Sequence, residues 1–389
     1  MWFFGNFKSF VSSVRGKLQK SLVSWDQTGG EVPSEGGGAA EKAPGKMPGY
    51  MCPVLITLVL YCIILFTKHI FPFGDKTIDY YDLSQQIAPL YYHIHDMLHG
   101  KTSFFFNFYS ALGLNMSVVT SGCSGLSPFN LFFLLVPRDY LLESLSFFQL
   151  IKILGMTLTM YFYLTKRFRA PYFFNVFLSV NYAFCGFVLM LYMENKWMDI
   201  AVFFPLIMYF YDRMMHGGRI TGYVLTLALS VISSFYLGFV IILFIFLYTG
   251  LRILADRLYA PKEKRTRTYM LELGFSTGLS LLLSSFIVIP QLRQILASSR
   301  FANGNSGSGN LIEKYIEIIR QTNPAYTTRW WTLFNIAFAS AVIFTGLIRV
   351  WKNRRLRFFS ISLIILMTAE LFVEGINLCW HFGSYIQYP

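Results

Sequence analysis

The stretch Met51–Thr67, MCPVLITLVLYCIILFT, decides the class of this protein. It has no charged side chain, and a helix of this length nearly crosses the roughly 30 Å hydrocarbon core of a bilayer. Hydrophobic residues make up 54% of the 389 residues and charged ones 14%, too little charge for a soluble protein of this size. The formal charge of +13 comes from basic residues between apolar spans, which argues against nucleic-acid binding and for a polytopic all-α membrane protein.

Outward from this span, further stretches are long and apolar enough to cross a membrane. We predict about nine spans, at 51–67, 142–165, 172–193, 198–214, 220–236, 237–252, 270–290, 330–348 and 358–375. With a cytoplasmic N-terminus, most Lys and Arg residues fall on the cytoplasmic connections, and the opposite orientation fails. Residues 1–50 are then a cytoplasmic basic tail and linker, and 51–389 a transmembrane domain with large outer loops at 68–141 and 291–329.

The first outer loop contains an unusual polar stretch, Asp79–Gly100, DYYDLSQQIAPLYYHIHDMLHG. Apolar residues recur in it at helical spacing, and a second stripe runs beside them with Asp82, Gln86 and His93, which predicts amphipathic helices. Pro89 should break or kink the run near Ala88, so we expect a short helix carrying Asp82 and Gln86 and a second helix starting at Pro89. The apolar segment Leu114–Pro137 contains helix breakers and is predicted to be a re-entrant or interfacial piece of this loop.

Two clusters in this loop suggest chemistry. A carboxylate at Asp82 could accept a proton from a substrate hydroxyl or hold a cation near a phosphate, with the Gln86 amide on a sugar or phosphate oxygen. The alternative is a solvated helix without chemistry. His95-Asp96-Met97-Leu98-His99 is similar to the HExxH pattern of zinc proteases, but Asp replaces Glu and no third ligand is evident, so we predict no metal site. The five cysteines form no CxxC pair.

Polar residues also interrupt the spans. Lys152 lies in the middle of a span and needs a partner, either an outer-loop acid or a lipid phosphate. Asn195, Trp197 and Asp199 belong to a polar cluster between two predicted spans. They are either part of a functional site or ordinary polar and aromatic residues of the membrane boundary. Ser127 and Pro128 predict a helix start, which is structural in the first instance, although a helix N-terminus facing a cavity also attracts phosphate.

Several motifs, taken in their order, resemble the bacterial YfhO family of membrane proteins over roughly residues 51–389. They are Asp82-x-x-x-Gln86-x-x-Pro89, Leu112-Gly113-Leu114-Asn115, Ser127-Pro128-Phe129-Asn130, Lys152, Asn195-x-Trp197-x-Asp199 with Pro205-Leu206, and Phe235-Tyr236-x-Gly238. The resemblance implies a GT-C-like glycosyltransferase fold, in which the first outer loop carries an essential acid. That acid maps to Asp82, and Asp199 would be a second polar residue of the same cavity. Family members commonly continue further, so the resemblance also implies a chain truncated at its C-terminus.

The resemblance implies transfer of a sugar from a polyprenyl-phosphate carrier to a cell-wall polymer such as teichoic acid, or to a glycolipid, on the outer face of a bacterial plasma membrane. Asp82 is the predicted catalytic residue. The predicted substrate-binding residues are Gln86, His93, Asn115, Arg138, Lys152, Asn195, Trp197 and Asp199. No cofactor is predicted, although a divalent cation is compatible with Asp82. The alternatives are a transporter or flippase for a lipid-linked substrate, which Lys152, Glu370 and Glu374 would suit, and a non-catalytic scaffold; no inverted repeat supports transport.

Overall fold

The protein is almost entirely helical in the part of the chain that the structure, a computed structural model, describes. The described residues are 49–80, 82–108, 113–115, 125–168, 170–259, 266–297, 346, 348, 351–369 and 380. The chain divides into two compact units, Met1–Ser234 and Phe235–Pro389. The tail 1–48, most of the loop 291–329 and the span predicted at 330–348 therefore lie almost wholly outside the described residues.

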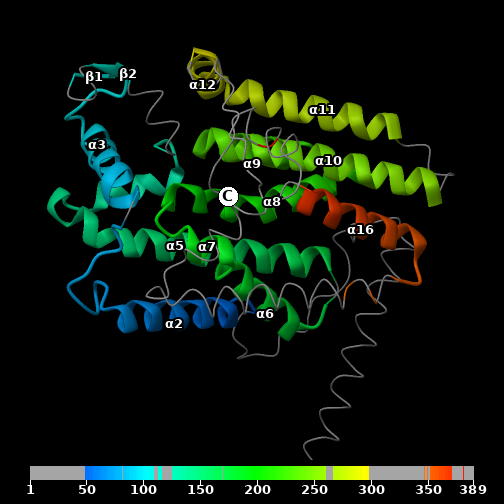
Figure 1. Ribbon diagram of the computed structural model, residues 1–389, viewed down its shortest axis with the longest axis horizontal. Coiled ribbons are helices and arrows are strands. Elements are labelled where there is room, and N and C mark those ends of the chain that lie inside the picture. Colours follow the sequence, from blue (N-terminus) through cyan, green and yellow to red (C-terminus); the bar gives the residue numbers. More distant parts are fainter. Residues whose placement is uncertain are drawn as a thin grey trace, which may run out of the picture. The chain divides into compact units, whose positions relative to one another are not determined.

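The first unit is organised around its longest helix, α5. Its main helices are α2 (Met51–Lys68), α5 (Leu141–Arg167), α6 (Tyr172–Ala183), α7 (Gly186–Met190), α8 (Met198–Met215) and α9 (Thr221–Ser233), with the short 3-10 helices η3 (Arg138–Tyr140) and η4 (Asn195–Trp197) at the starts of α5 and α8. Helix α5 packs against α2, α6 and α8, and α9 packs on α8. Figure 1 shows α2 and α5 side by side. The side chains of α5 therefore contact three of the other main helices of this unit.

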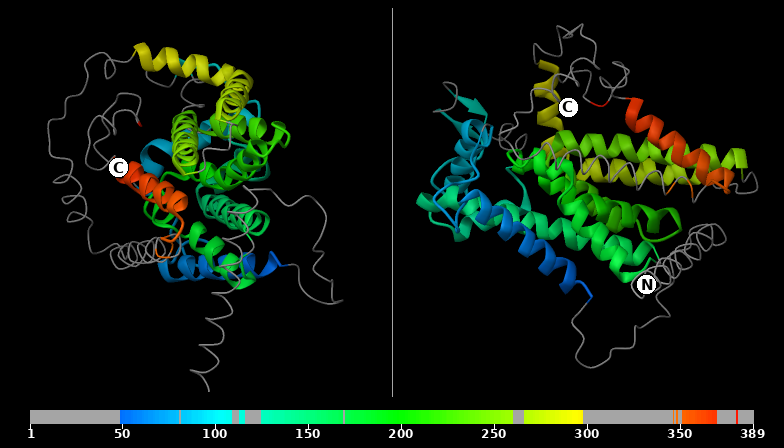
Figure 2. Two further views of the ribbon diagram at one scale, coloured as in Figure 1. Left: turned by 90° about the vertical axis from the view of Figure 1, so that its right-hand side faces the viewer. Right: turned by 60° about the horizontal axis from the view of Figure 1, so that its bottom comes forward.

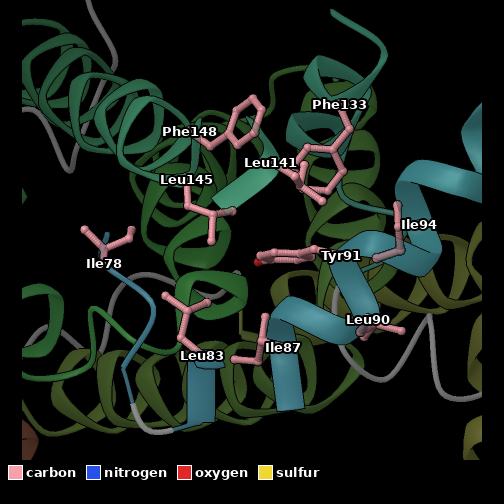
Figure 3. Close-up of a cluster of buried hydrophobic side chains, with 10 residues drawn as sticks. All are labelled: Ile78, Leu83, Ile87, Leu90, Tyr91, Ile94, Phe133, Leu141, Leu145 and Phe148. Atoms are coloured by element: carbon pink, nitrogen blue, oxygen red, sulfur yellow. The ribbon is translucent and has the colours of Figure 1, made fainter. Parts of the chain in front are cut away.

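The loop 68–141 folds back onto the start of α5 as a cap. It contains the π-helix η1 (Leu83–Ile87), α3 (Ala88–Leu98), the hairpin strands β1 (Phe106–Asn107) and β2 (Leu114–Asn115), and the 3-10 helix η2 (Pro128–Leu135). Apolar side chains of η1, α3 and η2, with Ile78, meet the first turns of α5 in one cluster (Figure 3), made of Ile78, Leu83, Ile87, Leu90, Tyr91, Ile94, Phe133, Leu141, Leu145 and Phe148. The Phe133 ring meets Tyr91 edge-on at 5.2 Å and Phe148 at 4.8 Å between centroids. The predicted amphipathic helices of this loop are confirmed.

The two helices expected around Pro89 are present as η1 and α3, but α3 begins at Ala88 and the chain does not break between them. Asp82, Ile87 and Ala88 all keep right-handed helical backbone angles, so the chain passes from η1 into α3 without leaving the helix. The Ala88 N–H bonds to the Leu83 carbonyl, five residues back, which is a π-helical turn. Proline lacks an N–H and crowds the preceding turn, and the extra residue in a widened turn relieves that crowding. The burial of Leu83 and Ile87 holds the turn in place.

The predicted helix start at Ser127 is confirmed, although the helix is of the 3-10 type. The Ser127 hydroxyl accepts the Phe129 N–H at 3.1 Å, and Pro128 occupies the first helical position. Of the segment Leu114–Pro137, the structure thus describes one strand and a 3-10 helix that extends to Leu135.

The second unit contains α10 (Phe235–Tyr259), α11 (Thr266–Leu283), α12 (Ser285–Ala297) and α16 (Arg354–Ala369). Within it, α10 packs against α11 and α16, as both views in Figure 2 show. An ion pair joins α16 to α10, from Arg355 Nη2 to Asp256 Oδ1 at 2.6 Å. Helix α12 continues to Ala297, past the predicted start of the loop 291–329, whose bounds stay a prediction.

Four described helices are long and apolar enough to cross a membrane: Met51–Lys68, Arg138–Arg167, Tyr172–Leu189 and Phe235–Tyr259. A fifth would be the pair Tyr269–Leu283 and Ser285–Leu296, which is bent by 86° where a single span was predicted. Helix α8 has the predicted length but carries Asp199, Asp212 and Arg213. The chain is therefore a multi-pass membrane protein, and the total of nine spans stays a prediction.

The cap predicts a contrast between two neighbouring phenylalanines of η2. Phe133 is buried, at 2% exposure, whereas Phe132 is exposed on the same helix. We expect Phe133→Ala to lower the free energy of unfolding by about 3–5 kcal/mol, because it leaves a cavity in the cluster. Phe132→Ala is the matched control and should change it by much less. Unfolding of the purified protein in mixed micelles measures both, and equal losses would contradict the assigned core.

Candidate functional site

Asp82 and Gln86 stand together on the outward side of η1. The Gln86 Nε2 amide donates a hydrogen bond to Asp82 Oδ1 at 3.1 Å. On the opposite side of the same turn, Leu83 and Ile87 are fully buried in the cluster against α5. Asp82 is partly buried and Gln86 exposed. The turn therefore presents the carboxylate on a rigid base, with its second oxygen left for another donor.

His93 connects α3 to the hairpin. Its ring is buried, and its Nδ1 lies 3.4 Å from the Asn107 side-chain Nδ2, which donates. Asn107 is in β1, and its neighbour Phe106 pairs with Asn115 in β2. Burial lowers the pKa of His93 below its ordinary value, against an opposing effect of the Asp96 carboxylate. The predicted residues His93 and Asn115 are thus brought into one substructure, by backbone pairing and one side-chain contact.

Arg138 closes the cap from the α5 side. Its Nε donates to both carboxylate oxygens of Asp96, at 3.1 and 3.2 Å, and its guanidinium lies over the Tyr92 ring at 4.8 Å. Burial works against the Asp96 charge, but the hydrogen bonds from Arg138 and His95 hold the pKa of Asp96 below its ordinary value. Arg138 is still 49% exposed, so part of this cation faces outward.

The zinc-protease-like pair His95 and His99 is occupied by structural contacts. His95 Nε2 bonds to the Val136 carbonyl at 2.9 Å, and His99 Nδ1 bonds to the His95 carbonyl at 2.8 Å. The two rings stack with centroids 4.2 Å apart. Among the described residues there is no group of three or more His, Cys, Asp or Glu placed to hold a metal ion.

Lys152, Asp199 and Asn195 meet in a closed polar cluster between α5 and the start of α8. The Lys152 ammonium lies 2.8 Å from Asp199 Oδ1 and donates to the Asn195 carbonyl, also at 2.8 Å. Lys152 is 2% exposed and Asp199 is fully buried. The Phe129 ring lies 5.7 Å from the ammonium. The partner of Lys152 is therefore Asp199, at the start of the span predicted at 198–214, and neither of the two expected partners, an acid of the outer loop 68–141 or a lipid phosphate.

This geometry separates six of the predicted site residues into two groups. Asp82, Gln86 and Arg138 reach the surface of the cap, whereas Lys152, Asn195 and Asp199 form the buried cluster. Trp197 lies in η4 beside that cluster and is partly buried. A family model described as bacterial membrane protein YfhO matches residues 53–389.

The chain belongs to the YfhO family of bacterial membrane proteins. Comparison with curated proteins and with solved structures gives no match. Family membership and the apolar helices agree on a membrane protein, and they assign no residue a role. The site residues therefore stay predictions, now with a known placement.

Sequence reasoning missed three polar contacts that hold the first unit together. Arg167 Nε binds Asp212 Oδ2 at 2.7 Å between the ends of α5 and α8. The hydroxyls of Thr57 and Thr157 lie 2.9 Å apart, and that of Tyr61 lies 3.0 Å from Gln149 Oε1. Asp212, an acid three residues before the end of α8, was the one available signal, because an acid within a span usually has a partner.

The buried pair predicts non-additive stability effects. Lys152→Met or Asp199→Leu alone should each cost about 3–5 kcal/mol, because each leaves one charge buried without its partner. The double variant should recover much of that loss. Arg138→Gln, at a half-exposed pair, should cost at most about 1 kcal/mol and is the control. A double-mutant cycle of unfolding free energies measures this, and additive losses would contradict the pairing.

The His93 environment predicts a pH dependence. Because the folded pKa of His93 is lowered, the unfolded chain takes up a proton below about pH 6.5 before the folded chain does, so stability falls as the pH drops. His93→Gln should flatten this fall, whereas His99→Gln, at an exposed position, should not. Thermal unfolding between about pH 8 and pH 5 measures it; the same slope in both variants would refute the assignment.

Proposed function

We propose that this protein is a membrane glycosyltransferase that moves a sugar from a polyprenyl-phosphate carrier to a cell-surface polymer or glycolipid. The proposal rests on membership of the YfhO family together with the acid that the cap displays. The N-terminus would lie in the cytoplasm and the cap on the outer face of a bacterial plasma membrane, in keeping with the distribution of basic residues.

The carboxylate of Asp82 is the observation that carries the proposal. Within the described residues, Asp96, Asp199, Asp212 and Asp256 each form an ion pair with Arg or Lys. Asp82 instead accepts a hydrogen bond from the neutral amide of Gln86. In the four ion pairs the carboxylate is already committed to a cation, whereas Asp82 is held through one oxygen by a neutral amide. Asp82 is thus suited to act as a general base.

The proposed reaction is a single displacement. Asp82 accepts the proton of an acceptor hydroxyl while the oxygen of that hydroxyl forms a bond to the anomeric carbon. The bond from that carbon to the phosphate oxygen breaks, and polyprenyl phosphate leaves with the electron pair. The anomeric centre is inverted. Gln86, beside Asp82 and exposed, is placed to hold a sugar hydroxyl.

The charge on the leaving phosphate needs a cation. Lys152 and Arg138 are the lysine and the arginine among the predicted substrate-binding residues. The ammonium of Lys152 is buried between Asp199 and the Asn195 carbonyl, while half of Arg138 is exposed. We therefore assign the phosphate to Arg138 and a supporting role to Lys152, Asn195 and Asp199. His93, Asn115 and Trp197 keep their proposed substrate contacts.

A carrier for the lipid-linked donor is the alternative. Its sequence basis was intramembrane charge at Lys152, Glu370 and Glu374. Lys152 is committed to Asp199, and the two glutamates lie outside the described residues. Reconstituted vesicles separate the two functions: transfer of labelled sugar from an externally added donor supports the enzyme, and movement of the donor lipid without transfer supports the carrier.

The Asp82→Asn variant tests the proposed base. We expect about a 100-fold or greater loss of sugar transfer at unchanged expression, because asparagine cannot take the proton. Asp75→Asn, an exposed acid of the same loop, is the matched control and should transfer normally. The assay is sugar on the outer polymer in cells carrying the altered native gene. Full activity of Asp82→Asn would end the role assigned to it.

A further inference from the structure

The 3-10 helix η2 turns most of its apolar side chains away from the protein. With three residues per turn, its side chains fall into three rows along the helix. The row with Asn130 and Phe133 is buried in the cap. The row with Leu131 and Leu134 and the row with Phe132 and Leu135 are exposed, to 57% at Leu131 and 78% at Leu135. Two of the three faces of this helix thus present contiguous large apolar side chains.

Such a surface needs an apolar environment. Contiguous exposed leucine and phenylalanine are rare on surfaces that face water, and they mark contact with a membrane or another protein. The position of η2 in the chain distinguishes between these. It ends three residues before Arg138, where the candidate span Arg138–Arg167 begins. Because η2 precedes this candidate span by three residues, a membrane crossed by that span would begin near η2.

The residues between η2 and α5 have the composition of a membrane interface. Arg138 and Tyr140 are both largely exposed. Arginine at this level meets lipid phosphates, and exposed tyrosine is typical of the boundary between water and acyl chains. Phe147, exposed on α5, lies roughly 10 Å beyond Tyr140 along the helix axis, so a bilayer entered near Tyr140 would place its ring among the acyl chains. The apolar faces of η2 are continuous along the chain with this lipid-facing surface.

We propose that η2 lies in the interfacial layer of the bilayer, with Leu131, Leu134 and Leu135 among the acyl chains and the following turn, Arg138–Tyr140, at the level of the headgroups, where the donor phosphate assigned to Arg138 would also lie. The occupant of this surface is the phospholipid bilayer itself. This goes beyond the proposed function and does not depend on it. It gives the cap two attachments, one to α5 through Phe133 and one to the lipid through the two outer faces of η2.

Fluorescence quenching tests the proposal. The environment-sensitive fluorophore NBD is attached to single cysteines at Leu131→Cys and Leu135→Cys, in the full chain with its native cysteines replaced by alanine. The protein is reconstituted into phosphatidylcholine vesicles. Ser84→Cys, on the exposed side of η1, is the control in the cap, and Leu158→Cys, exposed on α5, is the control in the span.

We expect the probes on η2 to be quenched by phosphatidylcholine with a doxyl group near the headgroup, and several-fold less by iodide than the Ser84 probe. The Leu158 probe should respond better to a doxyl group deep in the chain. Quenching of the η2 probes by iodide alone would place the helix in water. Protection from both quenchers would show that protein covers it. Either result would overturn the proposal.

Discussion

The ion pair between Lys152 and Asp199 is the constraint on which the first unit depends. Neither charge is tolerable alone inside a helix bundle, because the desolvation of each exceeds what a lone polar contact returns. Their 2.8 Å contact, with the Asn195 carbonyl as a second acceptor, fixes α5 against the start of α8. A slip of one residue in either helix would separate the two charges. The pair therefore sets the register in which the weaker apolar contacts of these helices form.

The cap inherits its position from the same helix. Leu141, Leu145 and Phe148 on the first turns of α5 receive the side chains of η1, α3 and η2. Lys152 follows Phe148 by one helical turn, so the cluster and the ion pair are consecutive layers on one rigid rod. The loop 68–141 is consequently not a free connection, since its apolar stripe has a fixed partner.

The sequence predicted what depends on local pattern. The first span and the amphipathic helices of the cap follow from periodicity, and the helix start at Ser127 follows from capping chemistry. The family follows from the order of the motifs. The partner of Lys152 did not, because Asp199 is far along the chain and only the packing of α5 on α8 selects it. No break occurs at Pro89, because burial of Leu83 and Ile87 favours a widened turn between the two expected helices. The apolar run Leu131–Leu135 of η2 has no periodicity, so its single buried residue, Phe133, could not be predicted.

The arrangement divides the charged residues by task. Lys152, Asp199, Arg167 and Asp212 neutralise each other in pairs inside the bundle, where they hold helices together. Asp82 is held by an amide instead, on a turn whose opposite side is packed against the helix that carries Lys152. A general base must be held to within about 0.5 Å of its productive position, and rigid elements do this better than loops. Asp82, held by an amide on a turn packed against α5, meets this requirement without being committed to an ion pair, and this is the physical reason for proposing it in preference to the acids that form ion pairs among the described residues.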